Sequence, residues 1–273
     1  MITYANDEMV PHLKTIWKEA FGDSDATIDF YFNRRYKAEN TLVYLVHGMP
    51  VSMLTLLPSQ MVVDGALRKV DYVYAVATLS AYRQRGLSTA LLRYANTHLR
   101  DGVWTTFLTP ATPSLFEFYY KQGYHDAFAV KEIELAYVDL AKAAKVPANA
   151  MTPERYKAIR DAHFYADGYV CWDLDSIAYI IAENALLGGR ALEILDRFLM
   201  IYCIRDNKIV VKETTLPHAM LPSAVKTVME AEGLFTASVR LHPNHAAGGA
   251  AKPFALTFKP PRVQNSYFNL ASD

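Results

Sequence analysis

The residue types between Val76 and Thr89 favour one chemistry above others, the binding of phosphate. This stretch passes from β-forming residues, through a turn with Arg83, Arg85 and Gly86, into a helix. The first turn of a helix presents unpaired backbone N–H groups and a partial positive charge, which together attract phosphate oxygens. The two guanidinium groups add full charges, and glycine permits close approach of the backbone. The sequence therefore predicts an anion site at this turn.

The elements around the turn follow from hydrophobic period and turn signals. Leu87 to Leu99 carries an apolar stripe with the spacing of a helix. Asp64-Gly65 is a strong signal for a tight hairpin turn. The other predicted elements of this half are helices over 7–21, 24–36 and 114–122, and strands over 41–46, 51–57, 61–63, 67–78, 103–108 and 127–138.

A second half with a similar order of elements follows a break at residues 140–151. Thr152-Pro153-Glu154 offers a helix N-cap followed by proline at the first helical position. Further helices are predicted from Asp173 or Asp175 to Leu187 and over 222–232. Strands are predicted over 191–204, 209–213, 236–241 and 254–258. The two halves share no motif.

Two motifs in the first half resemble the GNAT (Gcn-related N-acetyltransferase) superfamily. Its signature is Arg or Gln, two residues, Gly, one residue, then Gly or Ala, and Arg83-Gln84-Arg85-Gly86-Leu87-Ser88 matches it except for serine in the final small position. The family also has a tyrosine four residues before a Gly-Tyr pair, which selects Tyr119, with adjacent Tyr120 one residue away. Within the superfamily the pattern is most similar to the enhanced-intracellular-survival group, which carries tandem GNAT-like domains.

The resemblance implies acetyl-CoA as co-substrate and assigns roles to residues. Amides from Arg85 to Thr89 would hold the pyrophosphate, and the strand at Val76 would pair with the pantetheine arm and end in an oxyanion hole. Tyr119 would protonate the departing thiolate, because a phenol with a pKa near 10 is protonated at neutral pH. The predicted cofactor-binding residues are Val76, Ala77, Thr78, Arg83, Gln84, Arg85, Gly86, Leu87, Ser88 and Thr89.

The fold that the resemblance implies is an α/β (α+β) GNAT acyl-CoA N-acyltransferase fold. A mixed central sheet with flanking helices is expected, followed by a second, degenerate GNAT-like α/β half. The predicted boundaries are residues 1–138 for the acetyltransferase domain, 139–151 for a linker and 152–273 for the second domain.

The group that accepts the proton of the attacking amine stays open. An ammonium has no lone pair, so a base or a water chain must take a proton. The alternatives are Asp71, water and, as the resemblance to the enhanced-intracellular-survival group implies, the C-terminal carboxylate of Asp273. Asp71 is expected to be a surface carboxylate paired with Arg68 or Lys69. The acceptor itself is a small-molecule or peptide amine that the sequence does not identify.

Composition and charge exclude several classes of protein. The chain has 273 residues, of which 52% are hydrophobic, and Lys plus Arg equals Asp plus Glu at 28 each. No net field exists to attract nucleic acid or an anionic membrane. The N-terminus lacks a secretory pattern, and the chain is expected to be cytoplasmic, with no membrane span. Two cysteines without CxxC spacing argue against a zinc site, and no metal is expected. The composition is compatible with a homo-oligomer.

Two other classes of function compete with the enzyme. A GNAT fold could bind an acyl-CoA as a sensor without turnover. An interaction protein built on the second half would bind no coenzyme A at all.

Overall fold

The computed structural model describes residues 1–262 and 266–269, and the chain forms two compact units. Unit 1 comprises Met1–Met61, Ala66–Asp126 and Ala255–Pro260. Unit 2 comprises Val62–Gly65, Ala127–Phe254 and the described part of the C-terminal segment that begins at Pro261. The sequence predicted domains of 1–138 and 152–273, whereas the chain here leaves unit 1 at Asp126 and returns to it for six late residues.

The sheet of unit 1 has the strand order β1-β2-β3-β4-β5-β13. Parallel pairing joins β4 to β5, and antiparallel pairing joins β5 to β13 through Leu108↔Leu256 and Phe107↔Thr257. The last strand of this sheet therefore comes from the end of the chain. The bounds are β1 Ile2–Tyr4, β2 Thr41–Val46, β3 Met49–Val63, β4 Ala66–Thr78, β5 Val103–Leu108 and β13 Lys252–Thr257.

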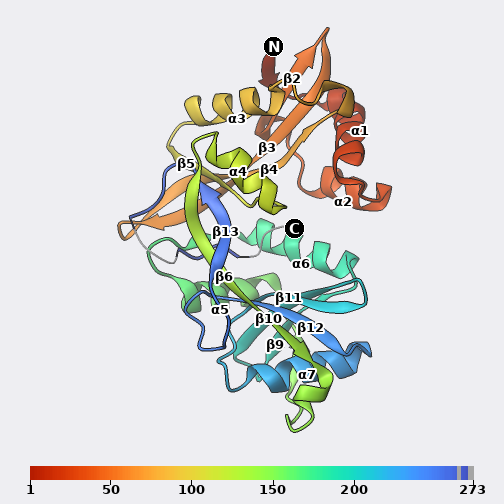
Figure 1. Cartoon of the computed structure of the whole chain (residues 1–273), viewed down its shortest axis with the longest axis vertical. Coiled ribbons are helices and arrows are strands. Elements are labelled where there is room, and N and C mark those ends of the chain that lie inside the picture. Colours follow the sequence, from red (N-terminus) through yellow and green to blue (C-terminus); the bar gives the residue numbers. More distant parts are fainter. Residues whose placement is uncertain (263–265, 270–273) are drawn as a thin grey trace. The chain divides into compact units, whose positions relative to one another are not determined.

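Alternation of side chains along the strands gives this sheet two apolar faces. Leu54, Leu56 and Val73 pack against helices α3 (Leu87–Thr97) and α4 (Pro113–Tyr120). Side chains on the opposite face of the sheet meet the other two helices. Tyr74 on this face contacts aromatic rings of α1 (Val10–Phe21) and α2 (Asp25–Arg34). Figure 1 shows α1 and α2 together at one side of this unit. The sheet is thus covered by helices on both faces.

Several predicted boundaries in unit 1 need correction. The first helix is split into a 3-10 turn, Asp7–Met9, and α1, which begins at Val10 with Pro11 in its first turn. The strands predicted over 51–57 and 61–63 are one continuous strand, β3. The hairpin turn at Asp64-Gly65 is confirmed, with φ of 51° and 74°.

Unit 2 repeats the order of unit 1. Apart from 3-10 turns and strand β8 (Val170–Cys171), the order β7-α5-α6-β9-β10-β11-α7-β12 matches β1-α1-α2-β2-β3-β4-α3-β5. Its sheet order is β6-β12-β11-β10-β9-β7, with parallel pairing between β11 and β12 as between β4 and β5. The predicted second half with the same order of elements is confirmed. The bounds are β6 His125–Ala136, β7 Ala148–Ala150, α5 Pro153–Phe164, α6 Leu174–Leu186, β9 Arg190–Ile194, β10 Phe198–Arg205, β11 Lys208–Thr214, α7 Leu221–Glu232 and β12 Thr236–Leu241.

One strand prediction in unit 2 was wrong. Residues 191–204 form the hairpin β9–β10 instead of a single strand. Leu195 and Asp196 make its turn with φ of 54° and 52°, a left-handed conformation usually taken by glycine or asparagine. Because neither residue type signals such a turn strongly, the sequence did not reveal it.

Three properties of the described residues bear on function. None of their helices is both long and apolar enough to cross a bilayer. No group of three or more His, Cys, Asp or Glu side chains among them is arranged to hold a metal ion. Both cysteines, Cys171 and Cys203, are free thiols.

The core of unit 2 contains a fully buried ion pair. Arg160 on α5 and Glu213 on β11 are both 0% exposed, and the Arg160 Nε lies 3.0 Å from Glu213 Oε2. The hydroxyls of Tyr156 and Tyr267 donate to the same carboxylate at 2.5 and 2.8 Å. Burial, followed by the charge of Glu213, raises the pKa of both tyrosines well above the ordinary value, so that both remain donors.

Breaking this pair is expected to destabilise unit 2. Arg160→Met should lower the free energy of unfolding by about 3–5 kcal/mol, because it leaves a buried carboxylate without its counter-charge. Urea denaturation monitored by circular dichroism measures the change. The matched control is Arg155→Met on the same helix: the Arg155 side chain is 48% exposed in its pair with Glu193, and its loss should cost less than about 1 kcal/mol. Equal losses of unfolding free energy in the two variants would contradict the prediction that the buried pair stabilises unit 2 more than the exposed pair does.

Candidate functional site

The turn before α3 has the geometry of an anion site. Gly86 is the N-cap of α3 with φ of 73°, and no side chain caps the helix. The first backbone N–H groups of α3, from Leu87 onward, are therefore left for a ligand. A Cβ built on Gly86 would meet nothing within 4 Å. This open space before an uncapped helix N-terminus fits the phosphate site that the sequence predicted.

The two arginines of the turn brace its backbone. Arg83 Nε donates to the carbonyl oxygen of Thr78 at 3.1 Å, and Arg85 Nη2 donates to that of Ala81 at 2.8 Å. The guanidinium of Arg85 also lies over the ring of Tyr82, 5.0 Å from its centroid. Both side chains are exposed, so each keeps N–H donors at the surface beside the helix N-terminus.

A bulge in β4 lies just before the predicted pantetheine-binding residues. Val73 and Val76 pack against the same cluster as α3 and α4, although residues three apart in a regular strand face opposite sides. Ala75 has φ of 51° and acts as an extra residue in the strand, as in a β-bulge. With this extra residue, Val73 and Val76 face the same side of the sheet. The bulge thus re-aims the backbone of Val76, Ala77 and Thr78.

The sheet of unit 1 opens at the same place. Pairing between β4 and β5 ends at Tyr72↔Phe107, while β4 continues to Thr78. From Phe107 onward β5 pairs with β13. The edge of β4 beyond Tyr72 is thus available to an extended ligand with amide groups, since such ligands pair with free strand edges.

Tyr119 is positioned by α4 against the core of unit 1. It is 7% exposed and belongs to the cluster that contains Val73, Leu108 and Tyr124. Burial, followed by the neighbouring Tyr124, raises the pKa of Tyr119 above the ordinary value for a phenol. Within the described part of the chain, its hydroxyl makes no hydrogen bond. The side chain is therefore a protonated donor without a structural partner.

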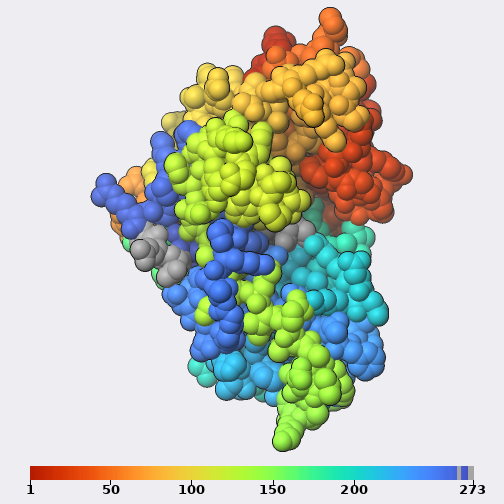
Figure 2. All heavy atoms as spheres, in the orientation of Figure 1, coloured from red at the N-terminus to blue at the C-terminus, as the bar shows by residue number. Residues whose placement is uncertain are grey.

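Tyr120 differs from its neighbour in exposure and in hydrogen bonding. Its hydroxyl donates to Asp126 Oδ1 at 2.7 Å, and its side chain is only half-buried. On the face of unit 1 in Figure 2, α4 lies at the surface. Of the two adjacent tyrosines, Tyr119 is the one turned inward.

Asp71 has a different environment from the one that the sequence predicted. It is 1% exposed, and its carboxylate is held by both Nε and Nη2 of Arg100, not by Arg68 or Lys69. The two-point ion pair commits both carboxylate oxygens of Asp71 to Arg100. This contact gives Asp71 a role in holding Arg100, while Asp273, the other candidate carboxylate, lies outside the described residues.

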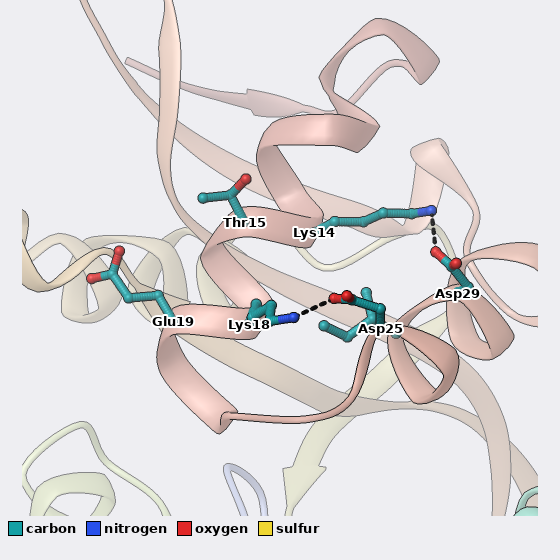
Figure 3. Close-up of a pocket in the computed structure, with 7 residues that line it drawn as sticks. Lys14, Thr15, Lys18, Glu19, Asp25 and Asp29 are labelled. Atoms are coloured by element: carbon teal, nitrogen blue, oxygen red, sulfur yellow. Dashed lines mark hydrogen bonds and ion pairs between the residues drawn. The ribbon is translucent and has the colours of Figure 1, made fainter.

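A surface pocket in unit 1 lies between α1 and α2, next to the turn. Its volume is about 570 Å³, and two ion pairs, Lys14–Asp29 and Lys18–Asp25, cross it. Figure 3 shows Glu19, which also lines the pocket, pointing away from these pairs. Glu19 accepts a hydrogen bond from the backbone N–H of Ser80. Sequence reasoning missed this contact, since no local pattern joins residues 61 positions apart.

The corresponding turn of unit 2 lacks these features. Helix α7 begins after Met220 with Pro222 in its first turn, and proline has no N–H to offer. No glycine or arginine precedes it between Leu216 and Leu221. The anion-site geometry therefore occurs in unit 1 and not at the equivalent helix of the repeat.

Comparison with known proteins supports a common fold. Residues 1–127 match the family model described as an acetyltransferase (GNAT) domain. No curated protein matches the sequence. Among solved structures, a GCN5-related N-acetyltransferase from Anabaena variabilis is 16% identical with a TM-score of 0.74, covering 94% of this chain and 72% of that one.

Two further solved structures share this fold along both units. A GCN5-related N-acetyltransferase from Kribbella flavida is 17% identical with a TM-score of 0.71, covering 94% of this chain and 70% of that one. Eis1 from Mycobacterium abscessus is 14% identical with a TM-score of 0.66, covering 94% of this chain and 73% of that one. Similarity at this level of identity indicates architecture, while activity must be argued from the site.

Proposed function

We propose that the chain is an acetyl-CoA-dependent N-acetyltransferase, a function supported by the match of residues 1–127 to the model of a GNAT acetyltransferase domain. It transfers the acetyl group to a primary amine of a small molecule or peptide by direct attack within a ternary complex. The observation that carries the proposal is the uncapped N-terminus of α3 behind Gly86, with Arg83 and Arg85 beside it.

In this proposal the diphosphate of acetyl-CoA binds the first turn of α3. The amides of Leu87, Ser88 and Thr89 donate to its oxygens, and the two guanidinium groups supply counter-charge. Gly86 leaves room for the phosphate because it has no side chain. A residue with a Cβ would intrude on this space and would also disfavour a φ of 73°.

The pantetheine arm extends along the free edge of β4. Its amide groups pair with the backbone of Val76, Ala77 and Thr78, as an added strand would. A backbone N–H near the bulge at Ala75 polarises the thioester carbonyl, an effect of about 3–4 kcal/mol per donor in other acyl transfers. The bulge therefore contributes to catalysis through the direction of an amide.

The chemical step breaks one bond and forms one. The lone pair of the amine nitrogen attacks the carbonyl carbon, and the C–S bond breaks as the tetrahedral intermediate collapses. Tyr119 gives its proton to the departing thiolate, which leaves as free coenzyme A. The proton lost by the amine passes to water, and Tyr119 regains a proton from solvent.

We expect the full-length protein to bind coenzyme A and acetyl-CoA and to release free thiol from acetyl-CoA with an amine. Isothermal titration calorimetry measures binding without knowledge of the acceptor. A thiol-release assay with aminoglycosides, polyamines and peptides then tests turnover. Binding without turnover on any amine would favour a non-catalytic acyl-CoA sensor, and absence of heat with both ligands would overturn the proposal.

A further inference from the structure

A carboxylate from α1 supports the turn that precedes the proposed diphosphate site. Glu19 accepts the backbone N–H of Ser80, the first residue of the 3-10 turn Ser80–Tyr82. The hydroxyl and then the amide of Ser80, together with the charge of Arg83, hold the pKa of Glu19 below its ordinary value. The carboxylate is thus ionised at neutral pH while it makes this contact.

Ser80 has no local partner for its N–H group. The first N–H groups of a helical turn lack partners within the turn, and Leu79, the N-cap of Ser80–Tyr82, provides no side-chain acceptor. Glu19 fills this role from a distant element. A second hydrogen bond joins this turn to strand β3: the backbone N–H of Leu79 donates to the carbonyl oxygen of Val51 at 3.0 Å.

The helix that carries Glu19 is firmly packed. Leu13, Ile16 and Trp17 on its inner face are at most 3% exposed. The ring of Trp17 lies 4.5 Å from that of Tyr31 and 5.7 Å from that of Tyr74, measured between centroids. Because Tyr74 directly precedes the bulge residue Ala75, α1 contacts both the bulge region and, through Glu19, the turn.

We propose that Glu19 is a positioning residue for cofactor binding. This inference rests on the proposed function. Its carboxylate fixes the start of the turn on α1 and thereby places Arg83 and the first amides of α3 where the diphosphate binds. The side chain acts through Ser80 and does not touch the ligand.

Simple electrostatics predicts the opposite effect, which makes the proposal testable. Glu19 is negatively charged and lies near Arg83, so it weakens the positive field that attracts a diphosphate. Were this its main influence, removing the charge would tighten the binding of coenzyme A. If Glu19 positions the turn, removing the acceptor oxygen weakens binding, and an uncharged side chain that keeps that oxygen restores it.

The test compares Glu19→Ala and Glu19→Gln in the full-length protein. By calorimetry with coenzyme A, Glu19→Ala should raise Kd about tenfold, and Glu19→Gln should stay within about twofold of wild type. Asp29→Ala is the matched control, since it removes an exposed carboxylate on α2 bonded to Lys14 at 2.6 Å and should leave Kd unchanged. Thermal melting of each variant checks that all are folded.

The outcomes separate this inference from the proposed function. If wild type binds coenzyme A and Glu19→Ala binds it as tightly or more tightly, Glu19 does not position the site. Equal weakening by Glu19→Ala and Asp29→Ala would also overturn the inference. Wild-type protein that gives no heat with coenzyme A would remove the proposed function itself, and this inference with it.

Discussion

Replacing Tyr119 with phenylalanine is expected to lower kcat for acetyl transfer by about 10²- to 10⁴-fold, the usual contribution of a positioned general acid. The Kd for coenzyme A should change by less than about twofold. Phenylalanine keeps the ring that packs beside Tyr124, with centroids 5.8 Å apart, and removes a hydroxyl without a structural partner. Thiol release under saturating substrates, together with calorimetry, measures the two quantities.

The pH dependence of the wild-type enzyme follows from the state of Tyr119. In the proposed mechanism the protonated phenol is the active form, and burial raises its pKa above the ordinary value. Activity should therefore rise with pH as the amine substrate loses its proton, without an alkaline decline from Tyr119 below pH of about 10.

Tyr120→Phe, which removes only the bond to Asp126, is the control for Tyr119→Phe. If Tyr120→Phe abolished turnover and Tyr119→Phe did not, the assignment of the acid would be reversed.

Gly86→Glu is expected to raise Kd for coenzyme A at least about a hundredfold. The new side chain enters the space in front of α3 and places a carboxylate in the proposed diphosphate site. Loss of two charge-assisted hydrogen bonds, each about 1.5–3 kcal/mol, is enough for this change. Calorimetry with coenzyme A checks it.

A control for backbone strain is available in the same unit. Gly22 ends α1 with φ of 72°, and a Cβ at this position would also meet nothing within 4 Å. Gly22→Glu should therefore destabilise the fold by a similar amount, about 1–2 kcal/mol, yet leave coenzyme A binding intact. Equal loss of binding in both variants would show that strain, and not occupation of the phosphate site, explains the result.

Features that depend on neighbouring residues could be predicted from the sequence. The turn at Arg83 and Gly86 is indicated by a strand, a glycine and an amphipathic helix in succession. Tyr119 lies at a fixed spacing from Gly123. The hairpin with the Asp64-Gly65 turn and the helices that end at glycine could likewise be predicted, because their signals lie within a few positions of one another.

Features that depend on distant contacts could not be predicted. Ala75 is an ordinary strand residue by type, so nothing local in the sequence indicates its φ of 51°. Asp71 finds Arg100 only once β4 and β5 are paired. Glu19 meets Ser80 across 61 positions, and the role of residues 255–260 in unit 1 depends on pairing with β5.

The late return of β13 to unit 1 has a consequence for synthesis on the ribosome. Residues 1–126 emerge first, but the edge of β5 that will receive Leu256 and Thr257 stays bare until residues 127–254 of unit 2 have also been translated. A nascent chain with such an edge is prone to pair with other molecules. A gene fragment that stops near codon 127 would encode the turn before α3 and Tyr119, yet its product would lack the strand β13 that pairs with β5.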